Sequence, residues 1–286
     1  MRALRLGEGG PLPRSGRARK RFAQHFLESA WVNKLVTAVA ATPDDSILEI
    51  GPGTGAITRP LAAGVRRLLA IEIDRDLAAN LEAAALPNVS VVTSDVLSVD
   101  LVPIISEWLG APPGPENQIR IVGNLPYNIS SPILFALLDL AARTNGVRDA
   151  MLMLQKEVAD RLVAKVGTGE YGVLTILTAL NADVTRVLSL PPGAFRPPPK
   201  VHSAVVRLVF RPPRVAVEDH ALFVRMVRTM FTQRRKTVAN ALKPFGVERG
   251  VNPGHALSVA GIDAGRRPET LDLAEMAALA GAFARP

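Results

Sequence analysis

The chain has no cysteine, and this absence excludes disulfide bridges, thiolate zinc sites and cysteine nucleophiles. Its four histidines are scattered along 286 residues, which makes a poor metal site, and we expect no metal. Apolar runs stay well short of the roughly 18 residues that cross a bilayer. The N-terminus also lacks the apolar core of a signal peptide. These absences predict a protein of the cytoplasm that works without thiol or metal chemistry.

Positive charge gathers at the two ends of the chain. The net charge of +8 divides into +6 over residues 1–21, −5 over residues 22–199 and +7 over residues 200–286. An acidic middle segment between two basic ends suggests an enzyme core in the middle of the chain and chain ends that bind a polyanion. The alternative is that each basic run is solvated surface. Residues 1–16 are rich in glycine, proline and arginine, and we expect them to be disordered.

The first predicted strand, residues 46–50, runs into a glycine-rich turn. The turn reads Gly-Pro-Gly-Thr-Gly over residues 51–55. Gly51 and Gly53 let the backbone approach a ligand closely, and the helix that follows presents free amide groups to it. The same residues also fit the dinucleotide fingerprint of nicotinamide enzymes, so this motif alone is a weak signal.

The next two predicted strands each end in a carboxylate. Strand 68–72 ends in Glu72, about 20 residues after the glycine turn, which is where such folds bind ribose hydroxyls. Strand 89–95 ends in Asp95, whose carboxylate is suited to accept a hydrogen bond from an adenine amino group. Each carboxylate alone is equally well read as a solvated loop residue. Together with the glycine turn they predict a bound adenosine-type cofactor.

A fourth predicted strand, residues 119–123, ends in Asn124-Leu125-Pro126-Tyr127. The exocyclic amine of a nucleobase is a poor nucleophile because its lone pair is delocalised into the ring. The Asn124 side-chain carbonyl and the main-chain carbonyl of Pro126 can accept both amine hydrogens and so orient the lone pair, while Tyr127 stacks on the base. The alternative is an ordinary strand-to-loop turn.

Proline is concentrated in a loop around Phe195. The loop covers residues 191–199 and lies between predicted strands at 182–188 and 204–210. Because prolines stiffen a loop, a rigid Phe195 can close the face of a flipped base opposite Tyr127. The alternative is a phenylalanine that fills the core beneath the loop.

The pattern becomes helical after Arg211-Pro212-Pro213, which predicts a domain boundary. We therefore expect a basic leader over residues 1–21, a catalytic domain over 22–210 and a helical domain over 211–286. Asp272 and Glu275 have the spacing of a capping pair for the last helix. The residues that we expect to bind the polyanion are Arg19, Lys20, Arg21, Arg234, Arg235 and Lys236.

The chain resembles the ribosomal RNA adenine N6,N6-dimethyltransferases, and most closely the branch that modifies small-subunit rRNA. The resemblance covers residue 19 to about residue 284. The matching stretches are residues 23–27, 49–55, 70–74, 94–97, 124–127, 155–161, 171–172, 195–203 and 233–237. In this order they are highly specific.

This resemblance implies a Rossmann-like class I methyltransferase domain with a seven-stranded, mostly parallel α/β sheet, followed by a small all-helical domain that docks on RNA. It implies S-adenosylmethionine as methyl donor and two adjacent adenosines near the 3′ end of 16S rRNA as acceptors, modified during ribosome biogenesis. Cofactor contacts are implied at His25, Leu27, Gly51, Glu72, Asp95 and Asn124. The family usually has asparagine where this chain has His25.

Three alternatives stay open at this point. A related methyltransferase acts on large-subunit (23S) rRNA and confers macrolide resistance, but Leu125 and the Phe195 loop favour the small-subunit branch. A nicotinamide enzyme leaves residues 124–127 unexplained. A non-catalytic assembly factor would keep the fold and bind RNA without turnover. We expect a monomer that acts on the small ribosomal subunit and has no membrane partner.

Overall fold

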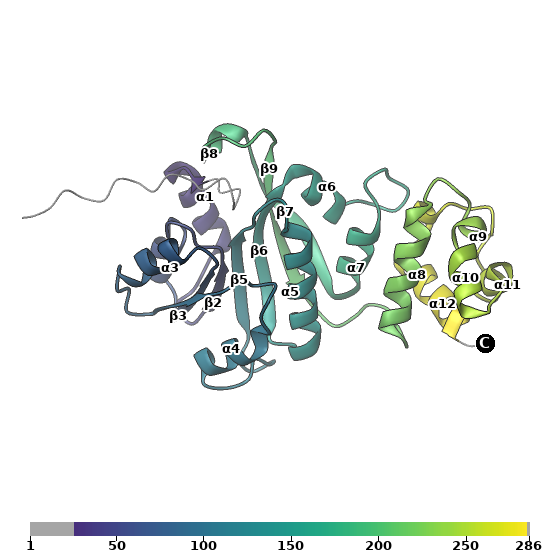
Figure 1. The fold of residues 1–286 in the computed structure, drawn as a ribbon, viewed down its shortest axis with the longest axis horizontal. Helices are drawn as coiled ribbons and strands as arrows, with labels where there is room; N and C mark the ends of the chain where they lie inside the picture. The colour runs from purple at the N-terminus through teal and green to yellow at the C-terminus, as the bar shows by residue number, and fades with distance from the viewer. Residues whose placement is uncertain (1–25, 285–286) are drawn as a thin grey trace, which may run out of the picture.

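The computed structural model describes residues 26–284, within which seven strands form one twisted sheet (Figure 1). The sheet order is β4-β3-β2-β5-β6-β9-β7. The strands are β2 (Ser46–Ile50), β3 (Arg67–Glu72), β4 (Val89–Thr93), β5 (Ile119–Asn124), β6 (Val147–Gln155), β7 (Ala182–Leu190) and β9 (Ser203–Phe210). From β4 to β6 neighbouring strands are parallel, and β9 is antiparallel to both β6 and β7. The predicted seven-stranded, mostly parallel sheet is confirmed.

Helices cover both faces of the sheet. One face carries α1 (Ser29–Val39), α2 (Thr58–Ala62) and α3 (Arg75–Glu82). The other carries α4 (Leu101–Leu109), α5 (Ser130–Thr144) and α6 (Lys156–Leu162). Side chains alternate between the two faces, so Ile47 packs under the first group of helices and Leu48 under the second. Burial on both faces explains why the central strands read as unbroken apolar runs.

The remaining helices gather at one end of the molecule, next to α7 (Val173–Asn181) (Figure 1). They are α8 (His220–Thr232), α9 (Val238–Ala241), α10 (Lys243–Arg249), α11 (Pro253–Val259) and α12 (Leu273–Ala284). The core of this group includes Ile176 and Leu180 of α7. Helix α7 therefore packs with residues on both sides of the predicted boundary at 211, and the separation into domains stays a prediction.

The predicted cap of the last helix is confirmed. The Asp272 carboxylate accepts a hydrogen bond from the Glu275 backbone N–H, and the Glu275 carboxylate accepts one from the Asp272 N–H, both at 2.8 Å. This reciprocal pair satisfies two backbone donors that the start of the helix would otherwise leave unpaired.

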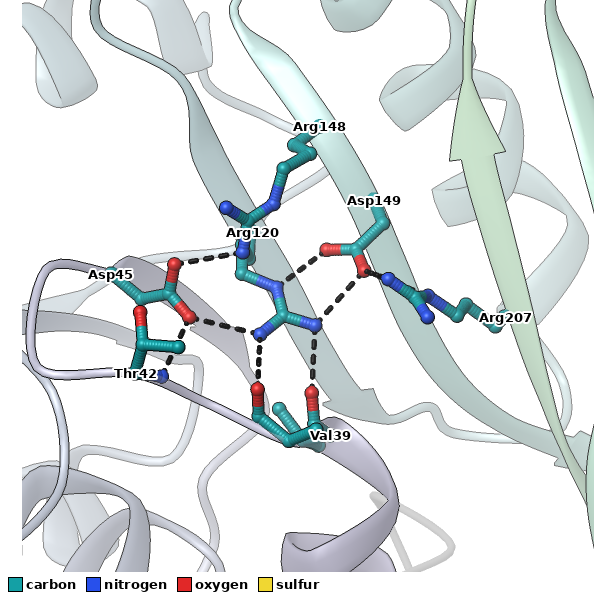
Figure 2. A network of polar contacts seen from close by, with 8 residues as sticks. Val39, Thr42, Asp45, Arg120, Arg148, Asp149 and Arg207 are labelled. Atoms are coloured by element: carbon teal, nitrogen blue, oxygen red, sulfur yellow. Dashed lines mark hydrogen bonds and ion pairs between the residues drawn. The ribbon is translucent and has the colours of Figure 1, made fainter.

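Arg120 on β5 ties α1 to the amino-terminal edge of the sheet (Figure 2). It is 4% exposed and donates to both carboxylate oxygens of Asp149 on β6, at 2.7 and 2.9 Å. The same guanidinium donates to Asp45, at 2.9 Å, and to the carbonyls of Val39 and Ala40 at the end of α1. One arginine thus closes a helix terminus and joins two neighbouring strands.

Two further arginines complete this network from the solvent side (Figure 2). Arg148 pairs with Asp45 at 2.7 Å, and Arg207 pairs with Asp149. Burial alone would raise the pKa of Asp45, but the Thr42 N–H and the arginines outweigh it and hold that pKa below its ordinary value. The Asp45 carboxylate therefore stays ionised and paired.

Among residues 26–284, no helix is both long and apolar enough to cross a membrane.

Candidate active site

A cleft opens at the carboxyl ends of β2, β3 and β5, where ligands of such sheets bind. It encloses about 990 Å³, a volume that includes the solvent at its open mouth. Of the residues predicted to bind the cofactor or the base, those that line it are Leu27, Gly51, Gly53, Glu72, Asp95, Asn124, Pro126 and Tyr127. Segments far apart in the sequence are thus brought together at one place.

The glycine turn needs its glycines for two physical reasons. Gly51, Gly53 and Gly55 have φ angles of +68°, +58° and +76°, in the left-handed region that other residues rarely adopt. A Cβ on Gly55 would also lie 2.9 Å from Leu81 Cδ1 of α3. The turn therefore needs glycine both for its left-handed backbone conformation and for the close packing of α3 behind it.

Glu72 holds the glycine turn in place. Its carboxylate accepts the Gly53 N–H at 2.9 Å and the Asp74 N–H at 2.9 Å. The residue is 4% exposed. Because an ionised carboxylate offers about four lone-pair sites, two acceptor positions are left for a ligand. Asp74 in turn caps α3 by accepting the Asp76 and Leu77 N–H groups.

Asp95 lies in the loop after β4, because the strand ends at Thr93, two residues before the end that we predicted. Its carboxylate accepts the Leu97 N–H at 2.9 Å and the Ser98 hydroxyl at 3.3 Å, which fixes the side chain beside the cleft. Ile73, directly after Glu72, also lines the cleft and is 44% exposed. The exposed apolar side chain of Ile73, in the same cleft as the Glu72 and Asp95 carboxylates, can pack on the face of an aromatic ring that carries polar groups at its edge.

The end of β5 makes a compact turn. A Cβ on Gly123 would lie 2.8 Å from Leu125 Cδ2 and 3.2 Å from the Ile50 carbonyl oxygen, so the turn depends on glycine there. The Pro126 carbonyl accepts the Ile129 N–H at 3.1 Å. We expected this carbonyl to be free, and it is not, because the turn closes on it. A carbonyl has two lone pairs, so one acceptor position remains.

The proline-rich loop forms a short strand, β8 (Phe195–Arg196), which pairs antiparallel with β1 (Phe26–Leu27). Phe195 is 0% exposed and lies in the apolar core with Leu35 and Met153, outside the lining of the cleft. This position is the core-filling alternative, and contact between Phe195 and a bound base stays a prediction.

Glu49, to which the sequence assigned no role, lies in β2 and is separated from the glycine turn by Ile50. It is 1% exposed, and neither its Oε2 nor Thr58 Oγ1 has a hydrogen-bond partner among the described residues. Burial raises the pKa of Glu49 to about 7; the nearby Thr58 side chain lowers it, and the charge of Glu72 adds to the rise. The signal available in the sequence was a carboxylate inside an otherwise apolar strand.

The expected RNA contacts are only partly covered by the structure. Arg19, Lys20 and Arg21 lie outside the described residues, and so does His25. Arg234 donates to the Gly169 carbonyl at 2.7 Å, which links it to the loop before α7. Arg235 and Lys236 are exposed. The structure thus assigns Arg234 a contact within the protein and leaves its two neighbours facing solvent.

A doubly covered, mostly parallel sheet, a glycine turn after its first strand and acidic ends on the next two strands define a class I methyltransferase fold. A family model described as ribosomal RNA adenine dimethylase matches residues 15–279. The chain belongs to the ribosomal RNA adenine dimethylase family.

Relatives and solved structures agree with this assignment. The ribosomal RNA small subunit methyltransferase A of Xylella fastidiosa (strain 9a5c) is 45% identical over 269 residues, covering 93% of this chain and 96% of the relative. The protein of the same name from Geobacter metallireducens is 45% identical over 272 residues, with the same coverage. A dimethyladenosine transferase from Plasmodium falciparum shares the fold at a TM-score of 0.70 and 24% identity, over 89% of this chain and 96% of that one. The 23S rRNA methyltransferase ErmE matches at a TM-score of 0.60 and 26% sequence identity, over 91% of this chain and 100% of that one.

Proposed function

We propose that this protein transfers methyl groups from S-adenosylmethionine to the N6 amines of two adjacent adenosines near the 3′ end of 16S rRNA. The product is N6,N6-dimethyladenosine, formed during assembly of the small ribosomal subunit. The observation that carries the proposal is that one cleft joins Glu72 and Asp95 to Asn124 and Tyr127. The cofactor site and the base-orienting site thereby lie in the same cleft.

The residues of the cleft fit S-adenosylmethionine. Glu72 keeps two acceptor positions beyond those that hold the turn, which suits the two hydroxyls of a ribose. Ile73 offers apolar cover for an adenine ring, and Asp95 lies beside it as an acceptor for the ring's amino group. Leu27 and the glycine turn form the rest of the wall. The bound cofactor supplies an activated methyl group on its sulfonium.

The protein's own part in the reaction is alignment. The Asn124 side-chain carbonyl and the remaining lone pair of the Pro126 carbonyl accept the two hydrogens of the adenosine amine. This directs the nitrogen lone pair at the methyl group, and Tyr127 stacks on the base. Phe195 packs in the core beside β1, and its contact with the base is a separate proposal. Methylation makes the nitrogen acidic enough to lose its proton without a strong base.

The protein acts as a monomer on the small subunit, in the cytoplasm. The support for the small-subunit assignment is the 45% identity to proteins that are named as small-subunit methyltransferases. Arg235 and Lys236 are exposed and carry the basic charge that RNA phosphates require.

The test is methyl transfer from labelled S-adenosylmethionine to small and large ribosomal subunits that lack the modification. We expect label on the small subunit only, with digestion placing dimethyladenosine at two adjacent positions near the 3′ end of 16S rRNA. Label on large-subunit RNA would assign the enzyme to the 23S branch. Binding to small subunits without any transfer would make it an assembly factor.

A further inference from the structure

We propose that Ser203 is a positioning residue for the methyl transfer, because it holds the ring of Tyr127 at the rim of the cleft through a hydrogen bond between the two hydroxyl groups. The proposal rests on the proposed function, in which Tyr127 stacks on the target base. The two oxygen atoms, Tyr127 Oη and Ser203 Oγ, are 2.5 Å apart, although the residues are separated by 76 positions in the sequence.

Ser203 is itself held rigidly. It is the first residue of β9, and it pairs with Gln155 of β6 on one side and with Leu190 of β7 on the other. It is 1% exposed. A residue fixed by strand pairing on both sides has little backbone freedom, so its hydroxyl is a fixed point for anything bonded to it.

Tyr127 has the opposite character. It lies in the turn after β5, is partly buried, and lines the cleft. Its backbone is anchored by the Ser130 hydroxyl, which donates to the Tyr127 carbonyl at 3.3 Å. The ring turns about two side-chain bonds, and the contact with Ser203 restrains its far end. A stacking ring that is fixed at both ends offers the base one surface in one orientation, which is what alignment by geometry requires.

The chemical state of the two groups suits this bond. Partial burial raises the pKa of Tyr127, while its hydrogen bond with Ser203 acts in the opposite direction. The phenol therefore stays protonated at neutral pH, so one hydroxyl donates and the other accepts. Removing the Ser203 hydroxyl leaves the strand pairing of β9 intact, because that pairing uses backbone groups only. The expected effect is thus on the ring and not on the fold.

The kinetic test compares Ser203→Ala, Tyr127→Phe and the double variant on unmodified small subunits. Each single variant removes one hydrogen bond, so we expect kcat to fall about 5- to 10-fold, with the KM for S-adenosylmethionine unchanged. Since both act through one bond, the double variant should be no slower than the slower single variant. Ser203→Thr keeps a hydroxyl and should recover most of the loss. Ser189→Ala, on the neighbouring strand β7, is the matched control and should behave as wild type.

A second measurement reads the ring directly. The chain has two tyrosines, so 3-fluorotyrosine labelling gives fluorine signals from two residues. Tyr171 is a reference, because its hydroxyl donates to the Leu271 carbonyl at 3.1 Å within the helical part of the molecule. In Ser203→Ala we expect the Tyr127 signal to shift and the Tyr171 signal to stay in place.

The proposal requires both results. An unchanged Tyr127 signal, an unchanged kcat, or a double variant whose losses multiply would each overturn it. Failure of the proposed function is a separate outcome, because wild-type protein would then transfer no methyl group to small subunits, whatever the fluorine spectra show.

Discussion

Glu72 bonds to the protein's own backbone before it bonds to any ligand. Its carboxylate joins the glycine turn to the start of α3 through Gly53 and Asp74. The same side chain has acceptor positions left over at the cleft. A substitution here would remove the proposed ligand contact and loosen the turn at once, so affinity and local order cannot be changed independently at this residue. Asn124 gives a cleaner test of the chemistry.

Asn124→Ala removes the side-chain carbonyl that we propose orients the amine. We expect kcat to fall at least 100-fold, because one well-placed catalytic hydrogen bond is commonly worth that much. Calorimetry should show that cofactor affinity changes far less than kcat. Asn117→Ala, in the loop before β5, is the control and should retain full activity. Retention of more than about a tenth of wild-type kcat by Asn124→Ala would rule out the orienting role.

Glu49 predicts how stability depends on pH. Its pKa in the folded protein is raised from 4.5 to about 7, so the folded state holds a proton that the unfolded state loses. The associated stability is fully present below about pH 4.5 and is lost as the pH rises through about 7. Across that window it amounts to roughly 3 kcal/mol.

Glu49→Gln keeps the shape of the side chain and removes its titration. We expect the free energy of unfolding to match wild type near pH 4 and to exceed it by up to about 3 kcal/mol near pH 8. Urea unfolding at several pH values measures this. Glu107→Gln, on the exposed side of α4, is the matched control. A pH profile that Glu49→Gln leaves unaltered would contradict the raised pKa.

At the scale of elements, the central strands and the cap of α12 were both predictable from local patterns. Strand 46–50 was located correctly, and so was the Asp272–Glu275 pair. Such features depend on residues close in sequence, where periodicity and spacing carry the signal. Local patterns left Phe195 open between the base and the core, because its burial depends on pairing with β1, about 170 residues earlier.

Arg120 shows a second limit of local patterns. A lone arginine inside an apolar strand gives no sign of its partners, which come from α1, the loop before β2 and β6. We expect Arg120→Met to lower the free energy of unfolding by about 3 kcal/mol or more, because it leaves the buried carboxylates Asp45 and Asp149 short of a counter-charge. Urea unfolding measures the loss.

The matched control for Arg120 is Arg143→Met on α5. Arg143 also pairs with two carboxylates, Asp100 and Asp139, but all three side chains are about half exposed or more. Exposed ion pairs contribute little, so this variant should unfold close to wild type. Equal losses for the two arginine variants would mean that burial does not govern the strength of these networks.

At the scale of the whole molecule, charge and chemistry are separated along the chain. Residues 22–199, which carry net charge −5, contain the described lining of the cleft, while residues 200–286 carry +7. A cofactor with a positive sulfonium and a polyanionic substrate have opposite electrostatic needs. Acidic residues in the segment that lines the cleft suit the positive sulfonium of the cofactor. Basic residues in the C-terminal segment suit the polyanionic substrate, so one polypeptide meets both needs.

The basic segment after α8 tests this division of labour. Arg235 and Lys236 are exposed, whereas Arg234 donates to the Gly169 carbonyl, so the two classes can be separated by substitution. Replacing Arg234, Arg235 and Lys236 together with alanine should reduce the slope of log K against log salt by up to about 2–3 units, at about 0.7–0.9 per phosphate contact. The double variant at Arg235 and Lys236 should account for most of that change, since Arg234 is already engaged within the protein.

Affinity for specific and unrelated RNA should fall alike, because phosphate contacts position the protein without reading sequence. Cofactor affinity should stay constant. An unaltered salt slope in the triple variant would contradict this prediction and would leave Arg19, Lys20 and Arg21 as the residues proposed to contact the phosphates.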